Sequence, residues 1–135
     1  MTKAKTHMMF QGQAEEAVAF YASVFSEFEV HSVDRYGEGE GGTPGSFKLA
    51  QVSLAGHELQ IFDSPPVHAF SFTPSFSLYV DFDSDDELAA AVAKLSEGGT
   101  VMMPLDNYGF SEQFAWIEDR FGVSWQLNLP SSASE

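Results

Sequence analysis

The sequence predicts an α+β fold in which two βαβββ modules form one curved, mostly antiparallel sheet with the helices outside. The order of one strand, one helix and three strands occurs twice, at about 6–63 and 75–129, with a proline-rich connection at 64–74 between the two runs. The length of 135 residues suits one core rather than two independent ones. We therefore predict a single domain, residues 1–135, whose concave inner face is the place for a ligand.

The first module is predicted from the spacing of its apolar residues. A helix is expected at 14–28, where apolar residues recur at helical steps and two glutamates lie near the start. The segment 37–46 contains five glycines and one proline and is expected to be a loop. The strands are expected at 6–10, 30–36, 47–54 and 58–62, the last two as a hairpin.

The second module repeats this order. Ser84 and Glu87 have the spacing of a helix capping box, and two glycines at 98–99 end the helix. Trp125 and Leu127 are expected to pack on that helix, and Asp119 is expected to bond backbone groups of its own turn. The strands are expected at 75–82, 100–105, 113–118 and 123–129, before an irregular tail at 130–135.

Composition and charge exclude several kinds of function. The chain has no cysteine, which excludes a disulfide framework, a thiolate nucleophile and a cysteine metal site. The acidic net charge of −14 makes nucleic acid and anionic membranes unfavourable partners. No apolar segment is as long as a membrane span, and the first ten residues lack the apolar core of a signal peptide. We therefore expect a cytoplasmic protein.

Three segments resemble one known family. They are QGQAEEAVAFYASVF at 11–25, RYGEGEGGTPGS at 35–46 and GFSEQFAWIEDRFGVSWQL at 109–127. They look like the PhnB-like branch of the vicinal-oxygen-chelate (VOC) superfamily, which is also called the glyoxalase/bleomycin-resistance/dioxygenase superfamily. Members of the branch often carry the label "3-demethylubiquinone-9 3-methyltransferase domain". The resemblance implies the glyoxalase/bleomycin-resistance fold and a homodimer, and it does not imply one activity.

The residues do not support the methyltransferase label. An enzyme of the common S-adenosylmethionine type needs a glycine loop between the first strand of a parallel sheet and a helix. Here the glycine-rich segment 37–46 is not followed by a helix, and Glu38 and Glu40 would repel a carboxylate. We therefore interpret the segment as a connecting loop.

The resemblance implies that metal-using relatives place His, Glu or Gln on inward-facing strand positions. These positions correspond to Thr6 or His7, Gln60, Ser75 and Gln126, and only the two glutamines keep a ligand type. Amide oxygens are weak ligands, and His7 is predicted to lie one residue out of register, on the opposite face. We expect no tight metal, with His7, Gln60 and Gln126 as weak candidates for a loosely held divalent ion.

The remaining candidates line an aromatic cleft. For the two amides, lining a ligand and bonding other side chains both stay open. The cleft candidates are Phe10, Gln60, Phe62, Tyr108, Phe110, Trp116 and Gln126.

Three functions remain open at this point. The first is a protein that binds a small organic ligand in this cleft without a tight metal. The alternative is a divalent-metal-dependent lyase, isomerase or dioxygenase of the same superfamily, and the third is an interaction module. The sequence assigns no catalytic residue and leaves open whether the protein is an enzyme.

Overall fold

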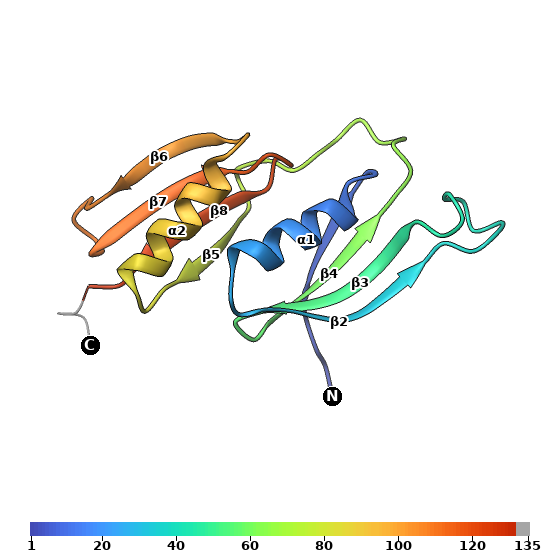
Figure 1. Cartoon of the computed structure of the whole chain (residues 1–135), viewed down its shortest axis with the longest axis horizontal. Helices are drawn as coiled ribbons and strands as arrows, with labels where there is room; N and C mark the ends of the chain where they lie inside the picture. Colours follow the sequence, from blue (N-terminus) through green and yellow to red (C-terminus); the bar gives the residue numbers. More distant parts are fainter. Residues whose placement is uncertain (132–135) are drawn as a thin grey trace. The chain divides into compact units, whose positions relative to one another are not determined.

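A computed structural model describes residues 1–131, so residues 132–135 of the predicted tail lie outside the described residues. The chain divides into two compact units, Met1–Phe70 and Ser71–Glu135. Within the described residues each unit holds one helix and one four-stranded sheet (Figure 1). The order βαβββ occurs in both units, which confirms the predicted α+β class.

The first unit contains a mixed sheet with the strand order β1-β4-β3-β2. β1 and β4 are parallel, whereas the β4–β3 and β3–β2 pairs are antiparallel. The elements are β1 (Thr6–Phe10), α1 (Ala14–Val24), β2 (Phe28–Arg35), β3 (Phe47–Leu54) and β4 (His57–Asp63).

The core of the first unit lies between α1 and one face of its sheet. Side chains alternate between the two faces of a strand, so the buried Leu59 and Ile61 on β4 share a face with Val52 on β3. α1 covers this face with small residues and one aromatic ring: Ala14, Ala17, Val18 and Tyr21.

α1 ends four residues before the predicted boundary at 28, because Phe25 already has an extended backbone. Phe25 and Phe28 are nevertheless both buried, so the apolar spacing continues beyond the end of the helix. The spacing therefore predicted the core positions correctly and the end of the helix wrongly.

The second unit has the corresponding strand order β5-β8-β7-β6, with a parallel β5–β8 pair and antiparallel β8–β7 and β7–β6 pairs. The predicted N-cap is confirmed, since Ser84 Oγ accepts a hydrogen bond from the backbone N–H of Glu87 at 3.3 Å. The elements are β5 (Ser77–Asp81), α2 (Asp85–Ser96), β6 (Thr100–Asp106), β7 (Gln113–Glu118) and β8 (Ser124–Leu129).

The β7–β8 hairpin is joined to the core by Asp119, which is only 3% exposed. Its Oδ1 accepts hydrogen bonds from the backbone N–H groups of Phe121 and Val123 at 2.9 and 3.0 Å, which confirms the predicted local bonding. Its Oδ2 accepts a hydrogen bond from the Trp125 indole N–H at 2.9 Å. Trp125 and Leu127 are fully buried, as predicted.

The strands form two separate sheets rather than the single sheet that the sequence predicted. In each unit the first strand pairs in parallel with the last strand of the same unit, so the strand pairs of each sheet all lie within one unit. No helix among the described residues is long and apolar enough to cross a membrane.

Candidate functional site

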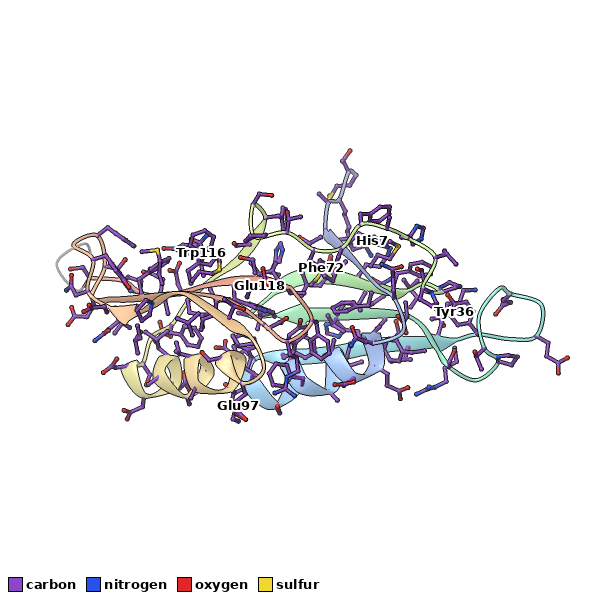
Figure 2. All side chains as sticks on the ribbon, turned by 90° about the horizontal axis from the view of Figure 1, so that it is seen from above. His7, Tyr36, Phe72, Glu97, Trp116 and Glu118 are labelled. Atoms are coloured by element: carbon purple, nitrogen blue, oxygen red, sulfur yellow. The ribbon has the colours of Figure 1, made fainter. Side chains whose placement is uncertain are left out.

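The first sheet carries a row of polar side chains on the face away from α1. His7 on β1 lies directly opposite Gln60 on β4, and Gln60 lies opposite Gln51 on β3. These residues alternate with the buried positions that pack on the helix, so they share the other face. Figure 2 shows His7 on the side of the ribbon away from the helix.

The polar side chains form one continuous hydrogen-bonded chain with a fixed direction. Lys5 Nζ donates to Gln51 Oε1 at 3.0 Å, and Gln51 Nε2 donates to Gln60 Oε1 at 2.8 Å. Gln60 Nε2 then donates to His7 Nδ1 at 2.9 Å. Because an ammonium group can only donate, Lys5 determines which end of each amide points toward His7.

This direction also determines the tautomer of His7. An amide N–H can only donate, so His7 Nδ1 accepts and the ring proton of the neutral imidazole lies on Nε2. The ring stacks on Phe62 with a centroid distance of 6.1 Å. The face of the first unit therefore presents His7 as a hydrogen-bond donor through Nε2.

The predicted register of His7 was wrong, since His7 shares a face with Gln60 and Thr6 pairs with Leu59 on the opposite face. The length of the strand was predicted correctly, but the face of the sheet that each of its side chains occupies depends on the pairing with the partner strand. Phe10 also lies on the face opposite to Gln60, where it is 3% exposed and part of the core.

The second sheet has a comparable polar group on the face away from α2. Trp116 Nε1 donates to Ser124 Oγ at 2.8 Å, and the hydroxyl groups of Ser124 and Ser77 lie 2.6 Å apart. Gln126 Nε2 donates to Ser77 Oγ at 3.2 Å. In the part of the chain that the structure describes, Gln126 Oε1 accepts no hydrogen bond, so it remains available as an acceptor.

An aromatic cluster of Tyr79, Tyr108, Phe110 and Phe114 lies beside this polar group. Phe114 forms the centre, with ring distances of 6.3 Å to Tyr79, 6.1 Å to Tyr108 and 5.0 Å to Phe110. Phe114 is 4% exposed, whereas Tyr79 and Phe110 are 53% and 58% exposed. Burial, and then the charge of Asp81, raise the pKa of Tyr79 above its ordinary value.

Asn128 and Asp81 form a further polar pair on the same face. Asn128 Nδ2 donates to Asp81 Oδ1 at 2.8 Å. Asn128 is 6% exposed, and its Oδ1 has no hydrogen-bond partner among residues 1–131. A buried acceptor without a partner is costly, so this position favours a donor from outside the described side chains.

Six of the seven predicted cleft residues lie on these two faces. Gln60 and Phe62 lie on the first, and the other four, which are Tyr108, Phe110, Trp116 and Gln126, belong to the second unit. The prediction missed Lys5, Gln51, Ser77, Ser124, Tyr79 and Phe114. Strand alternation could have indicated Gln51, since it lies between two apolar residues of β3.

The donor atoms around His7 do not fit a tightly bound divalent ion. A histidine that binds metal through Nε2 must carry its proton on Nδ1 and donate it to an acceptor. Here Nδ1 already accepts from Gln60, and Gln60 Oε1 already accepts from Gln51. No three His, Asp or Glu side chains of the described residues form a group that could hold a metal ion.

Comparison with known structures supports the class of the fold. A glyoxylase/bleomycin resistance protein/dioxygenase domain from Frankia sp. EAN1pec superimposes with a TM-score of 0.69 at 11% identity, covering 96% of this chain and 98% of that one. A mutant of the fosfomycin resistance protein FosX from Listeria monocytogenes, complexed with Mn(II) and a dihydroxypropylphosphonic acid, gives 0.70 at 9% identity, with coverages of 98% and 95%. At these identities the likeness shows the fold alone, which is the glyoxalase/bleomycin-resistance fold.

A narrower relationship follows from the sequence. The family model described as 3-demethylubiquinone-9 3-methyltransferase matches residues 2–128. A PhnB protein from Bacillus cereus is 43% identical, with a TM-score of 0.88 over 95% of this chain and 99% of that one. None of the curated proteins matches the chain. The chain belongs to the 3-demethylubiquinone-9 3-methyltransferase (PhnB-like) family.

Proposed function

We propose that the protein binds a small organic ligand with an aromatic part and needs no tightly bound metal for it. The observation that carries the proposal is the aromatic cluster of the second unit, where exposed Tyr79 and Phe110 surround buried Phe114. Single exposed apolar residues are ordinary on protein surfaces, but a packed group beside unsatisfied polar atoms is typical of a ligand site.

The polar atoms next to the cluster determine which polar groups a ligand of this site should carry. Gln126 Oε1 and Asn128 Oδ1 are both acceptors without a donor in the described chain. Tyr79 lies opposite Gln126 in the register, so the amide and the aromatic surface are adjacent. A ligand with an aromatic ring and an N–H or O–H donor would satisfy both features.

The hydrogen-bonded chain of the first unit supports binding without a metal. It holds His7 in the tautomer that donates through Nε2, which suits a ligand acceptor and opposes coordination of a cation. The opposing observation is that His7 and Gln60 do share a face. For this reason a loosely held divalent ion, serving an enzyme of the superfamily type, remains the second candidate.

We do not propose methyl transfer. The glycine-rich loop at 37–46 connects β2 to β3 and leads into no helix, so it offers no helix N-terminus to a cofactor. The name of the family model is therefore a label of relationship and not a proposed activity. We further propose that the protein is cytoplasmic and that it forms a homodimer. Light scattering after gel filtration would test the homodimer by its molar mass.

Ligand binding is tested by calorimetry of the whole protein with aromatic amines and phenols, using cyclohexyl analogues as the comparison. Phe110→Ala removes an exposed ring of the cluster and should weaken binding by roughly ten-fold, or about 1.4 kcal/mol. Phe76→Ala is the matched control, because Phe76 is 65% exposed in the same unit and lies outside the cluster. Equal losses in the two variants, or no saturable heat with any aromatic probe, would refute the proposal.

The metal question has its own measurement. Protein purified without chelator is analysed for bound elements, and its melting temperature is measured with added Mn, Ni, Zn and Fe. We expect less than stoichiometric metal and no increase in melting temperature. A stoichiometric ion, or stabilisation by one of these metals, would favour the second candidate.

A further inference from the structure

The first unit contains a cavity of about 570 Å³ that shares no residue with the hydrogen-bonded chain of His7. Three segments line it: Gly12 after β1, part of the stretch from Tyr36 to Phe47, and 63–66 at the end of β4. Figure 2 shows Tyr36 at the base of the glycine-rich loop. The volume lies within the range of small-molecule sites.

We infer that this cavity binds a small molecule carrying an ammonium or guanidinium group, with the carboxylate of Asp63 as its partner. The inference is independent of the aromatic cluster and extends the proposed function to a second site. Asp63 is 8% exposed and lines the cavity. No Lys, Arg or His is among the lining residues.

The hydrogen bonds of Asp63 leave its charge uncompensated. Oδ1 accepts from the backbone N–H of Gly12 at 2.5 Å, and the Asp63 backbone carbonyl accepts from the Tyr36 hydroxyl at 2.5 Å. Within residues 1–131 no donor reaches Oδ2. A buried carboxylate with one neutral donor is costly, so a cationic group that reaches Oδ2 would gain the attraction without competition.

The basic residues next to the cavity in the sequence are already paired with other carboxylates. Arg35 contacts Glu15 at 3.0 Å, and Lys48 contacts Glu40 at 3.4 Å. Neither of them therefore serves as the counterion of Asp63. The net charge of −14 further favours the approach of a cation over that of an anion.

The loop that walls the cavity is held in place by its own contacts. Glu40 Oε1 accepts from the backbone N–H of Gly37 at 2.6 Å, and this bond, together with Lys48, lowers the pKa of Glu40. Gly42 packs on the ring of Tyr36 so closely that an added Cβ would lie 2.6 Å from ring atoms. This wall of the cavity is thus ordered before a ligand binds, which lowers the entropic cost of binding.

The test is a titration of the full-length, ¹⁵N-labelled protein with methylguanidinium, followed by the amide resonances of Gly12 and Gly42. Methylurea, which is neutral and similar in shape, and acetate are the comparison probes. We expect saturable shifts with methylguanidinium and none with methylurea or acetate. Absence of saturation with methylguanidinium, or equal binding of methylurea, would overturn the inference.

Two variants and two controls connect the binding to Asp63. Asp63→Asn keeps an acceptor for Gly12 and removes the charge, so affinity should fall at least ten-fold. Thr43→Lys places a tethered ammonium group on the cavity wall and should compete with the ligand even if Asp63→Asn folds poorly. Glu38→Gln, an exposed acid of the same loop that does not line the cavity, should leave affinity unchanged.

Phe110→Ala should also leave methylguanidinium binding unchanged, which separates this site from the aromatic cluster. Unchanged affinity in both Asp63→Asn and Thr43→Lys would contradict the inference, and so would an equal loss in Glu38→Gln.

Discussion

Replacing Gln60 by glutamate should switch the tautomer of His7. In the wild type, Gln60 Nε2 donates to His7 Nδ1 at 2.9 Å, and Gln60 Oε1 accepts from Gln51 at 2.8 Å. Gln60→Glu preserves the second bond and places a carboxylate oxygen where the donor was. Nδ1 must then carry the proton, which frees the Nε2 lone pair.

The magnitude follows from the role of such partners in metal sites. A carboxylate that accepts the Nδ1 proton typically changes metal affinity by about 10–100-fold, or roughly 1.4–2.8 kcal/mol. Gln60→Glu should therefore raise the affinity of His7 for Zn²⁺ or Co²⁺ by that factor. Long-range ¹H–¹⁵N NMR identifies the protonated ring nitrogen, and a Co²⁺ titration followed by absorption measures the affinity.

The same change of tautomer should follow from a substitution at Gln51, the next member of the hydrogen-bonded chain. Gln51→Glu still accepts from Lys5 but presents an oxygen to Gln60 Oε1, so the Gln60 amide must turn over and offer its oxygen to His7. Gln11→Glu is the control, because Gln11 forms hydrogen bonds with the backbone of Phe70 and His68 and is not a member of the hydrogen-bonded chain of His7. A wild-type His7 protonated on Nδ1, or no change of tautomer in Gln60→Glu, would refute the reasoning.

The remaining predictions concern stability and charge. Asp119→Ala removes the carboxylate that accepts from three donors and should cost roughly 3–5 kcal/mol in urea unfolding followed by tryptophan fluorescence. Asp119→Asn should be less costly, and equal values would contradict the bond pattern. Ser84→Ala should cost about 1 kcal/mol through loss of the α2 N-cap, and an unchanged unfolding midpoint would contradict this. The hydrogen bond from Arg35 and then its charge lower the pKa of Glu15, so the contribution of this exposed pair is present at neutral pH and is lost as the pH falls through the lowered pKa. Arg35→Gln should return the pKa of Glu15 toward its ordinary value in a ¹³C NMR titration, and an unchanged titration would rule out the pairing.

Local patterns in the sequence predicted the elements and the core well. The cap at Ser84 and the burial of Trp125 and Leu127 follow from a few neighbouring residues, and the structure confirms them. Features that depend on partner strands were harder to predict. The facing of His7 is determined by its pairing with Gln60, and a one-residue error in register moves a side chain to the other face.

The candidate site was predicted only in part for the same reason. The polar chain takes its members from the N-terminal arm and from three strands that are up to 53 positions apart in the sequence. No local pattern connects Lys5 with Gln51, so their contact could not be inferred. The aromatic cluster was missed at Tyr79 and Phe114, because aromatic residues in strands more often belong to a core.

The bonding of Asp119 has a consequence for how the second unit opens. Phe121 and Val123 lie at a turn, where amide protons usually exchange with solvent through small local fluctuations. Their N–H groups share one buried carboxylate with the indole of Trp125, which belongs to the core. The carboxylate of Asp119 therefore links the turn directly to an indole of the core. These two amides should therefore exchange as slowly as the core strands, so that the hairpin and the core form one cooperative unit of unfolding.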